Sequence, residues 1–318
     1  MELFDLVSLT SDTPMRTLIE GFGTNLEFGR PLAPLTSYKT GGPAGLFLQV
    51  ESVDEVVRAV TSARRLEVPF FIMGSGTNLL VSDEGYDGLV IKVDIQGLSM
   101  HSATEIECGA GDQLQALVDF ATANSLTGLE FAAGIWGTVG GAIYGNAGAF
   151  GGEIGSVVSE ITLVDVEGTV KTVPADYCQF SYRHSRLKEL YETIVSARFA
   201  MQQGDAEEIR GRVDEIIRQR EGKHPVDGCS AGCFFKNIPD DTEEHGKLPA
   251  GRLLDEIGAK EMSVGGARVF ERHANIIVNT GTATSKDIRQ LADILKKKVN
   301  DRFGIDLQEE VRQLGRFD

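Results

Sequence analysis

The segment from Gly128 to Gly152 contains nine glycines in 25 residues. Apolar residues such as Phe131, Ile143 and Phe150 are interspersed among the glycines, whereas a flexible linker would be polar. Because glycine has no Cβ, such a backbone can approach a large ligand and present its N–H groups to it. The pattern favours a backbone-lined cofactor site over a set of tight turns between buried strands.

A second glycine-containing loop, Gly74 to Asn78, follows an apolar run at residues 68–73. The third glycine of a dinucleotide-binding fingerprint is missing, and residues 79–93 have the pattern of strands where a helix would be required. The free N–H groups of this loop and its Ser75 and Thr77 side chains predict a nest for a pyrophosphate.

Three cations, Arg218, Arg220 and Lys223, end a predicted amphipathic helix that starts near residue 204. The helix dipole alone favours cations in a last turn. In so acidic a chain their convergence before the loop 230–236 also indicates an anionic substrate group, and a diphosphate fits best.

Four cysteines are too few for a disulfide scaffold in a chain of this length. Cys229 and Cys233 are four positions apart, which suggests a redox pair or half of a metal site. No second cysteine pair or histidine cluster accompanies them, and we expect no metal.

Alternating helices and strands must position these groups. A capping box of Ser52 and Glu55 predicts a helix that ends near Leu66, and residues 68–73 predict a buried strand. Asp112 is expected to cap the next helix, whose apolar face carries Leu114, Leu117, Val118 and Ala121.

Near the C-terminus, Thr284 or Ser285 is expected to cap a helix that stops at Gly304. Strand alternation then predicts one face with Ile305, Leu307 and Val311 and an opposite face with Glu310 and Arg312.

The composition narrows the functional class. The 318 residues predict two or three units with their own cores, and 31 basic against 47 acidic residues, a net charge of −16, argue against nucleic-acid or anionic-membrane partners. Residues 1–16 lack the features of a signal peptide, and no apolar run reaches the roughly 20 residues of a membrane span. We therefore expect a cytoplasmic location, and no obligate protein partner is evident.

Eight segments resemble, in the correct order, the signature blocks of the UDP-N-acetylenolpyruvoylglucosamine reductase family. The 50 positions between Arg183 and Cys233 (233 − 183) are similar to its shorter, type II-like subtype. The blocks are TSYKTGGPA (36–44), GSGTNLLVSDEGYDGLVI (74–91), GLEFAAGIWGTVGGAIYGNAGAFGGEIG (128–155), FSYRHSRLK (180–188), SAGCFFKN (230–237), AGRLLDEIGAK (250–260), VGGARVFERHANIIVN (264–279) and GIDLQEEVR (304–312).

The resemblance implies an α+β fold with a split FAD-binding module of the vanillyl-alcohol oxidase (PCMH) type and a separate α+β substrate-binding domain. It implies FAD-binding subdomains over residues 1–95 and 96–203 and a substrate-binding domain over 204–303, with the strand at 304–318 returning near the site. It further implies noncovalent FAD, NADPH as hydride donor and a UDP-sugar substrate whose reduction gives UDP-N-acetylmuramate for the cell wall.

Site residues are also implied by the resemblance. The catalytic set is Arg183, Cys233 and Glu310, and Tyr182, Arg220, Lys223, Asn237 and His273 fall in the substrate-binding blocks. The implied FAD contacts are Tyr38, Lys39, Thr40, Gly41, Gly42, Gly74, Ser75, Gly76, Thr77, Asn78, Gly134, Gly137, Thr138, Gly140, Gly141, Asn146, Ala147, Gly148, Gly152 and Ile154.

The implied chemistry needs these residue types. Hydride arriving at C3 of the enolpyruvyl group leaves negative charge on C2 and on the carboxylate, which Arg183 and Glu310 can stabilise. Cys233 stands where the family has a proton-donating serine, and Cys229 and Trp136 stand where prolines are common. Arg183 could instead form a structural salt bridge, Glu310 a solvated strand face, and Cys233 a small buried hydrophobe.

Two other functions remain open from the sequence. One is an oxidase of sugars or alcohols from the same flavoenzyme superfamily, which would need a different substrate cap. The other is a noncatalytic flavin-binding or redox-sensing protein in which Cys229 and Cys233 form a disulfide.

Overall fold

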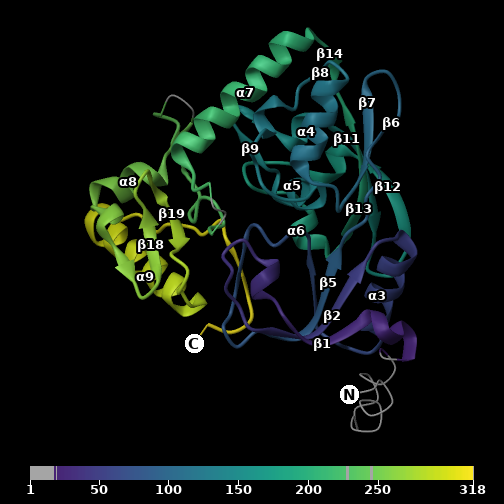
Figure 1. Cartoon of the computed structure of the whole chain (residues 1–318), viewed down its shortest axis with the longest axis horizontal. Helices are drawn as coiled ribbons and strands as arrows, with labels where there is room; N and C mark the ends of the chain where they lie inside the picture. Colours follow the sequence, from purple (N-terminus) through teal and green to yellow (C-terminus); the bar gives the residue numbers. More distant parts are fainter. Residues whose placement is uncertain (1–17, 19, 227–228, 244–245, 318) are drawn as a thin grey trace. The chain divides into compact units, whose positions relative to one another are not determined.

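A computed structural model describes residues 18, 20–226, 229–243 and 246–317 (Figure 1). The chain divides into two compact units, each made of three stretches of sequence. Unit 1 takes its residues from 1–30, 44–75 and 87–217, and unit 2 from 31–43, 76–86 and 218–318. The divisions at residues 95, 203 and 303 stay a prediction, and residues 1–16, which we tested for a signal peptide, lie outside the described part of the chain.

The first sheet of unit 1 has the strand order β1-β2-β5-β3, with β3 parallel to β5. Helix α3 (Val53–Arg65) packs its buried residues Val56, Ala59, Val60 and Ala63 into the same core. Ser52 caps α3 as predicted, accepting the Glu55 N–H, but the Glu55 carboxylate accepts the N–H of Glu51 at 2.8 Å. The expected buried strand is half-buried over most of its length. The strand bounds are β1 Leu26–Pro31, β2 Pro43–Val50, β3 Phe70–Met73 and β5 Tyr86–Val93.

The second sheet of unit 1 is antiparallel, in the order β12-β11-β13-β7-β6. Helix α4 (Leu114–Ala123) buries the four apolar residues expected of it, but the expectation that Asp112 caps it is wrong. The Asp112 carboxylate accepts the N–H groups of Gly97 (3.0 Å) and Gly109 (2.8 Å), and so closes the turn before the helix. The strand bounds are β6 Ser99–Met100, β7 Glu105–Gly109, β11 Val158–Val164, β12 Val170–Pro174 and β13 Thr193–Ala200.

The amphipathic helix α7 (Ala206–Lys223) buries Ile209 and Val213, while Ile216 and Ile217 are half-buried. The apolar face expected of an amphipathic helix is therefore present. The short elements of unit 1 are β8 Leu126–Thr127, α5 Val139–Gly145, β9 Gly148–Ala149, β10 Gly152–Glu153, α6 Leu187–Leu190 and β14 Gln202–Gln203.

Unit 2 is built around a three-stranded antiparallel sheet, in the order β17-β18-β19, and the helices α8 and α9. The prediction for α9 is confirmed, because Thr284 and Asp287 form a capping box and Gly304 ends the helix with a φ of 69°. The bounds are β17 Ser263–Val264, β18 Ala267–Phe270, β19 His273–Asn279, α8 Ala250–Glu256 and α9 Ser285–Phe303, with β15 Ile238–Pro239 and β16 Lys247–Leu248 as a short pair.

The expected C-terminal strand is only partly present. Leu307 and Val311 are buried as predicted, but strand β20 begins at Arg312 (Arg312–Leu314) and runs parallel to β4 (Leu79–Val81). Residues 308–310 pair with residues 234–236 of unit 2 only through an isolated bridge and do not form a strand. In this pairing the Phe234 carbonyl accepts the Glu310 N–H at 2.8 Å.

One buried amide, Asn275 of β19, holds residues 233–236 in place. The Asn275 carbonyl accepts the Phe234 N–H (2.7 Å), and its side chain both accepts the Phe235 N–H (2.9 Å) and donates to the Phe235 carbonyl (2.8 Å). Asn275 is 2% exposed, so no water replaces these bonds.

We predict that Asn275→Ala lowers the free energy of unfolding by about 2–3 kcal/mol, because a buried N–H and a buried carbonyl of Phe235 lose their partners. Urea unfolding followed by fluorescence measures the change. Gln203→Ala is the control, since Gln203 also donates to a backbone carbonyl, that of Ala103, but on the exposed surface. Equal stability of the two variants would contradict the prediction.

Candidate active site

The glycine-rich segment of unit 1 is held by hydrogen bonds to the turn before α4 and to the first turn of α4 itself. Gly140 donates to the Ala110 carbonyl at 2.9 Å, and Gly134 donates to the side-chain oxygen of Gln115 at 2.7 Å. Thr138 caps α5 by accepting the Gly141 N–H at 3.3 Å. The path of this main chain is thus fixed by the protein itself.

The loop that starts at Gly74 packs against the start of α5. A Cβ added to Gly74 would lie 2.3 Å from Thr138 Oγ1, so the two glycine-containing segments meet only because Gly74 has no side chain. The Ser75 hydroxyl beside it is buried and makes no hydrogen bond to any residue that the structure describes. A buried, unpaired hydroxyl at this place suits a ligand oxygen.

In unit 2, residues 36–42 lie against residues 76–78. Ser37 donates its N–H to the Gly76 carbonyl and its hydroxyl to the Thr77 carbonyl, both at 3.2 Å. Thr40 is 4% exposed. Its hydroxyl, like that of Ser75, is buried and has no hydrogen-bond partner among the described residues. In each unit, such an orphan hydroxyl could be satisfied by a phosphate oxygen of a ligand.

Tyr38 differs from a ligand-facing residue. Its side chain is fully buried in the core of unit 2, and burial raises the pKa of its phenol, against the smaller lowering by the Ala231 backbone. Its carbonyl accepts the side-chain N–H of Asn279 at 2.8 Å. A contact of Tyr38 with a cofactor would therefore need a main-chain atom other than this carbonyl.

The glycines in the predicted cofactor set fall into two groups. An added Cβ would collide with protein backbone or a ring at Gly42 (2.3 Å from the Asp83 carbonyl), at Gly148 (2.7 Å from the Gly152 carbonyl) and at Gly152 (2.5 Å from the Phe131 ring). Packing alone requires glycine there. Gly141 is exposed, and its Cβ would meet only Thr138 Oγ1, at 3.5 Å.

Arg183 lies at the tip of a tight turn in unit 1. Ser181 and His184 exchange backbone hydrogen bonds of 3.1 and 3.0 Å, and Arg183 has a left-handed backbone with a φ of 54°. The guanidinium lies over the Tyr182 ring, 5.3 Å from its centroid. A left-handed backbone is uncommon for a residue other than glycine, so the tight turn must require this conformation at Arg183.

Cys233 and Glu310 are brought together within unit 2. Cys233 forms a β-bridge with Ile276, and the neighbouring Phe234 accepts the Glu310 N–H. The Glu310 carbonyl accepts the side-chain N–H of Asn78 at 3.1 Å. Both catalytic candidates are half-buried. Cys229 and Cys233 are not joined by the disulfide that the redox-sensor alternative requires.

The basic cluster lies in the last turn of α7, with Lys223 exposed and Arg220 half-buried. His224 follows, 5.7 Å from the ring of His273. Burial lowers the pKa of His224 to about 4, with further lowering by Arg220, His273 and Lys223, so the imidazole is neutral at pH 7. Burial also lowers the pKa of His273.

Three structurally important residues escaped the sequence analysis. Arg272 donates to the carbonyls of Glu221 (3.1 Å) and Gly222 (3.4 Å) and so satisfies the end of α7. Asn275 and Asn279 are polar residues within the otherwise apolar strand β19. Their presence in an apolar run could have indicated a structural role from the sequence alone. Asn237, predicted to bind substrate, accepts the Ala250 N–H at the start of α8 (3.2 Å).

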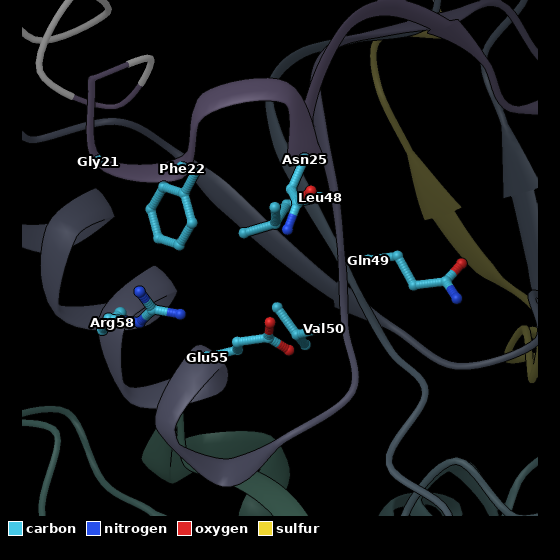
Figure 2. Close-up of a pocket in the computed structure, with 8 residues that line it drawn as sticks. All are labelled: Gly21, Phe22, Asn25, Leu48, Gln49, Val50, Glu55 and Arg58. Atoms are coloured by element: carbon cyan, nitrogen blue, oxygen red, sulfur yellow. The ribbon is translucent and has the colours of Figure 1, made fainter.

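A small hollow beside α3 and β2 contains none of the predicted site residues (Figure 2). Arg58 lies there over the Phe22 ring, 5.9 Å from its centroid. We assign this hollow no part in the chemistry. Its lining residues are Gly21, Phe22, Asn25, Leu48, Gln49, Val50, Glu55 and Arg58.

The chain is similar to known proteins over most of its length. The profile of the UDP-N-acetylenolpyruvoylglucosamine reductase C-terminal domain matches residues 224–314, and that of an FAD binding domain matches residues 44–174. A UDP-N-acetylenolpyruvoylglucosamine reductase from Caldanaerobacter subterraneus subsp. tengcongensis is 37% identical over 91% of this chain and 94% of its own. One from Solibacter usitatus is 38% identical over 90% and 95%. The crystal structure of UDP-N-acetylenolpyruvylglucosamine reductase from Thermus caldophilus matches with a TM-score of 0.77 and 32% identity, over 91% of this chain and 98% of that one.

We predict that Gly141→Ala lowers FAD affinity by about tenfold or more without lowering the stability of the FAD-stripped protein, because the added Cβ has room within the protein and would meet only a ligand. FAD occupancy from absorbance and the thermal midpoint of the stripped protein are the measurements. Gly140→Ala is the matched control: its Cβ would lie 3.0 Å from the Ala110 Cβ, so we expect lost stability. Full FAD occupancy in Gly141→Ala would contradict the assignment.

Proposed function

Because the chain belongs to the UDP-N-acetylenolpyruvoylglucosamine reductase family, we propose that Arg183, Cys233 and Glu310 carry the reaction of that family. The protein is an FAD-dependent oxidoreductase that uses NADPH to reduce the enolpyruvyl group of UDP-N-acetylenolpyruvoylglucosamine to UDP-N-acetylmuramate, a precursor of peptidoglycan. The observation that supports the proposed roles most directly is the backbone pairing in unit 2, where the Glu310 N–H donates to the carbonyl of Phe234, the residue that follows Cys233.

FAD, when bound, would supply the hydride chemistry of the reaction, with NADPH as the source of the hydride. We propose that residues 74–78 and 134–141 of the glycine-containing segments, with Thr40 and the main chain of residues 38–42, hold this cofactor. The orphan hydroxyls of Ser75 and Thr40 support this proposal.

The remaining steps fall to side chains of this chain. Arg183 binds the substrate carboxylate through its guanidinium fork, and the Glu310 carboxyl group hydrogen-bonds the other developing negative oxygen. Cys233 donates its thiol proton to C2, and the resulting thiolate regains a proton from solvent. The new C3–H and C2–H bonds thus replace the carbon–carbon double bond.

The substrate is a UDP-sugar, and we propose that Arg220 and Lys223 bind its diphosphate and that Tyr182, Asn237 and His273 are further substrate-binding residues. No helix in the described part of the chain is long and apolar enough to cross a membrane. We propose a cytoplasmic enzyme that needs no nucleic acid, membrane or obligate protein partner.

We predict that Glu310→Gln and Arg183→Ala each slow reoxidation of the reduced flavin by the enolpyruvyl substrate by about 10²-fold or more, the scale for losing a preorganised charge partner. Reduction by NADPH should survive. Anaerobic stopped-flow absorbance separates the two half-reactions. If Glu310→Gln reoxidises at the wild-type rate, Glu310 has a structural role and not a chemical one.

We predict that Cys233→Ala reduces flavin with NADPH normally but turns over about 10²-fold more slowly, since a general acid is lost. Cys233→Ser should retain substantial turnover. The wild-type rate should fall at alkaline pH, because a thiol ionises more readily than a hydroxyl and the thiolate cannot donate, and this fall should be absent from Cys233→Ser. Wild-type turnover in Cys233→Ala would assign the proton to another group.

A further inference from the structure

The turn that carries Arg183 is fastened to the end of helix α5. Its base residue, Ser181, accepts two hydrogen bonds on one carbonyl: the backbone N–H of His184 at 3.0 Å and the side-chain N–H of Asn146 at 2.9 Å. The tip of the turn is Tyr182 and the left-handed Arg183. The position of the Ser181 carbonyl therefore sets where the turn begins.

Asn146 is built into the protein on both sides of its amide. It is 0% exposed, ends α5 with a φ of 45°, and accepts the Gly155 N–H at 2.9 Å while it donates to Ser181. Both polar atoms of the side chain thus have protein partners. A side chain bonded in this way is better suited to hold two segments together than to contact a cofactor.

We propose that Asn146 is a positioning residue, which fixes Arg183 relative to the cofactor-binding glycine segment through the Ser181 carbonyl. The inference rests on the proposed role of Arg183. Helix α5 is only seven residues long, with Thr138 capping its start and Asn146 ending it. Thr138 packs on Gly74, so one short helix connects the predicted pyrophosphate loop at one end with the Arg183 turn at the other.

Other bonds hold the segment that follows Arg183 independently of Asn146. The Ser185 hydroxyl donates to the Tyr144 carbonyl at 2.7 Å, and the Arg186 N–H donates to the Cys178 carbonyl at 2.8 Å. The Lys188 ammonium also donates to the Arg183 carbonyl at 2.8 Å, so loss of the Asn146 bond should shift residues 181–183 without opening the turn, while residues 185–188 stay in place. The effect of such a change should appear in carboxylate binding by Arg183, in addition to the loss of stability that follows from unpairing a buried polar group.

Asn146→Asp tests the positioning role of Asn146 with almost no change in the shape of the side chain. Aspartate tolerates a left-handed backbone and keeps an oxygen for the Gly155 N–H, but it replaces the donor to Ser181 with a second acceptor. We expect reoxidation by the enolpyruvyl substrate to slow by about 10- to 100-fold, the scale of a misplaced binding group, with FAD retained and reduction by NADPH unchanged. Lowering the pH should partly restore the rate relative to wild type, because a protonated carboxyl group can again donate to Ser181.

Asn124→Asp is the matched control. Asn124 also ends a helix, α4, and donates its amide to a backbone carbonyl, that of Phe120 at 2.8 Å, but it has no bond to the Arg183 turn. Both half-reactions should be unchanged in this variant. If Asn146→Asp does not fold, Asn146→Gly keeps the left-handed backbone, removes the bond and should show the same slow reoxidation.

A double-variant cycle separates positioning from general damage. In an Arg183→Ala background, Asn146→Asp should cause little further slowing of reoxidation, because the group that it positions is absent. Full additivity, wild-type reoxidation in a folded Asn146 variant, or equal slowing of reduction by NADPH would overturn the proposal. If Arg183→Ala itself reoxidises normally, the proposed role of Arg183 fails first; if only the Asn146 variants are normal, the positioning inference alone fails.

Discussion

A ligand can be bound by bare main chain only where the protein fixes the path of that main chain, and in residues 134–141 bonds to the turn before α4 and to its first turn do so. The Ala110 carbonyl and the Gln115 side chain accept N–H groups from Gly140 and Gly134. A buried backbone N–H without a partner is costly, so these bonds fix the path of the glycine segment before any cofactor arrives. The start of α5, the packing of Gly74 and the end of α5 at Asn146 all follow from that path.

Unit 2 uses side-chain amides for a similar purpose. Strand β19 carries Asn275 and Asn279, and each bonds main chain that is distant in sequence: Asn275 bonds Phe235, and Asn279 bonds Tyr38 and the turn before α9. An amide side chain has both a donor and an acceptor, so it can take the place of a neighbouring strand at an irregular position. Segments that cannot form a regular sheet, such as the one around Cys233, are held in this way.

The parts of the fold that local chemistry decides were predictable from the sequence. The caps at Ser52 and Thr284 and the stop at Gly304 depend on a few neighbouring residues, and the structure has all three. The misplaced cap at Asp112 has a tertiary cause, because its carboxylate finds N–H groups of a turn that the sequence pattern does not reveal. The strand expected over residues 305–312 was wrong in extent for the same reason: alternation reports which side chains are buried but not which backbone is available to pair.

In the candidate site, too, the sequence predicted what depends on local residues but not what depends on tertiary contacts. Sequence patterns located the segments around Gly141, Cys233 and Glu310, but they could not separate a glycine required by packing from one open to a ligand, because that difference lies in the partner segment. Local charge was predictable where net charge was not informative: the chain has a net charge of −16, yet the sequence groups Arg218, Arg220 and Lys223 at the end of one helix. A diphosphate placed beside these cations would meet favourable charge that net composition would not suggest.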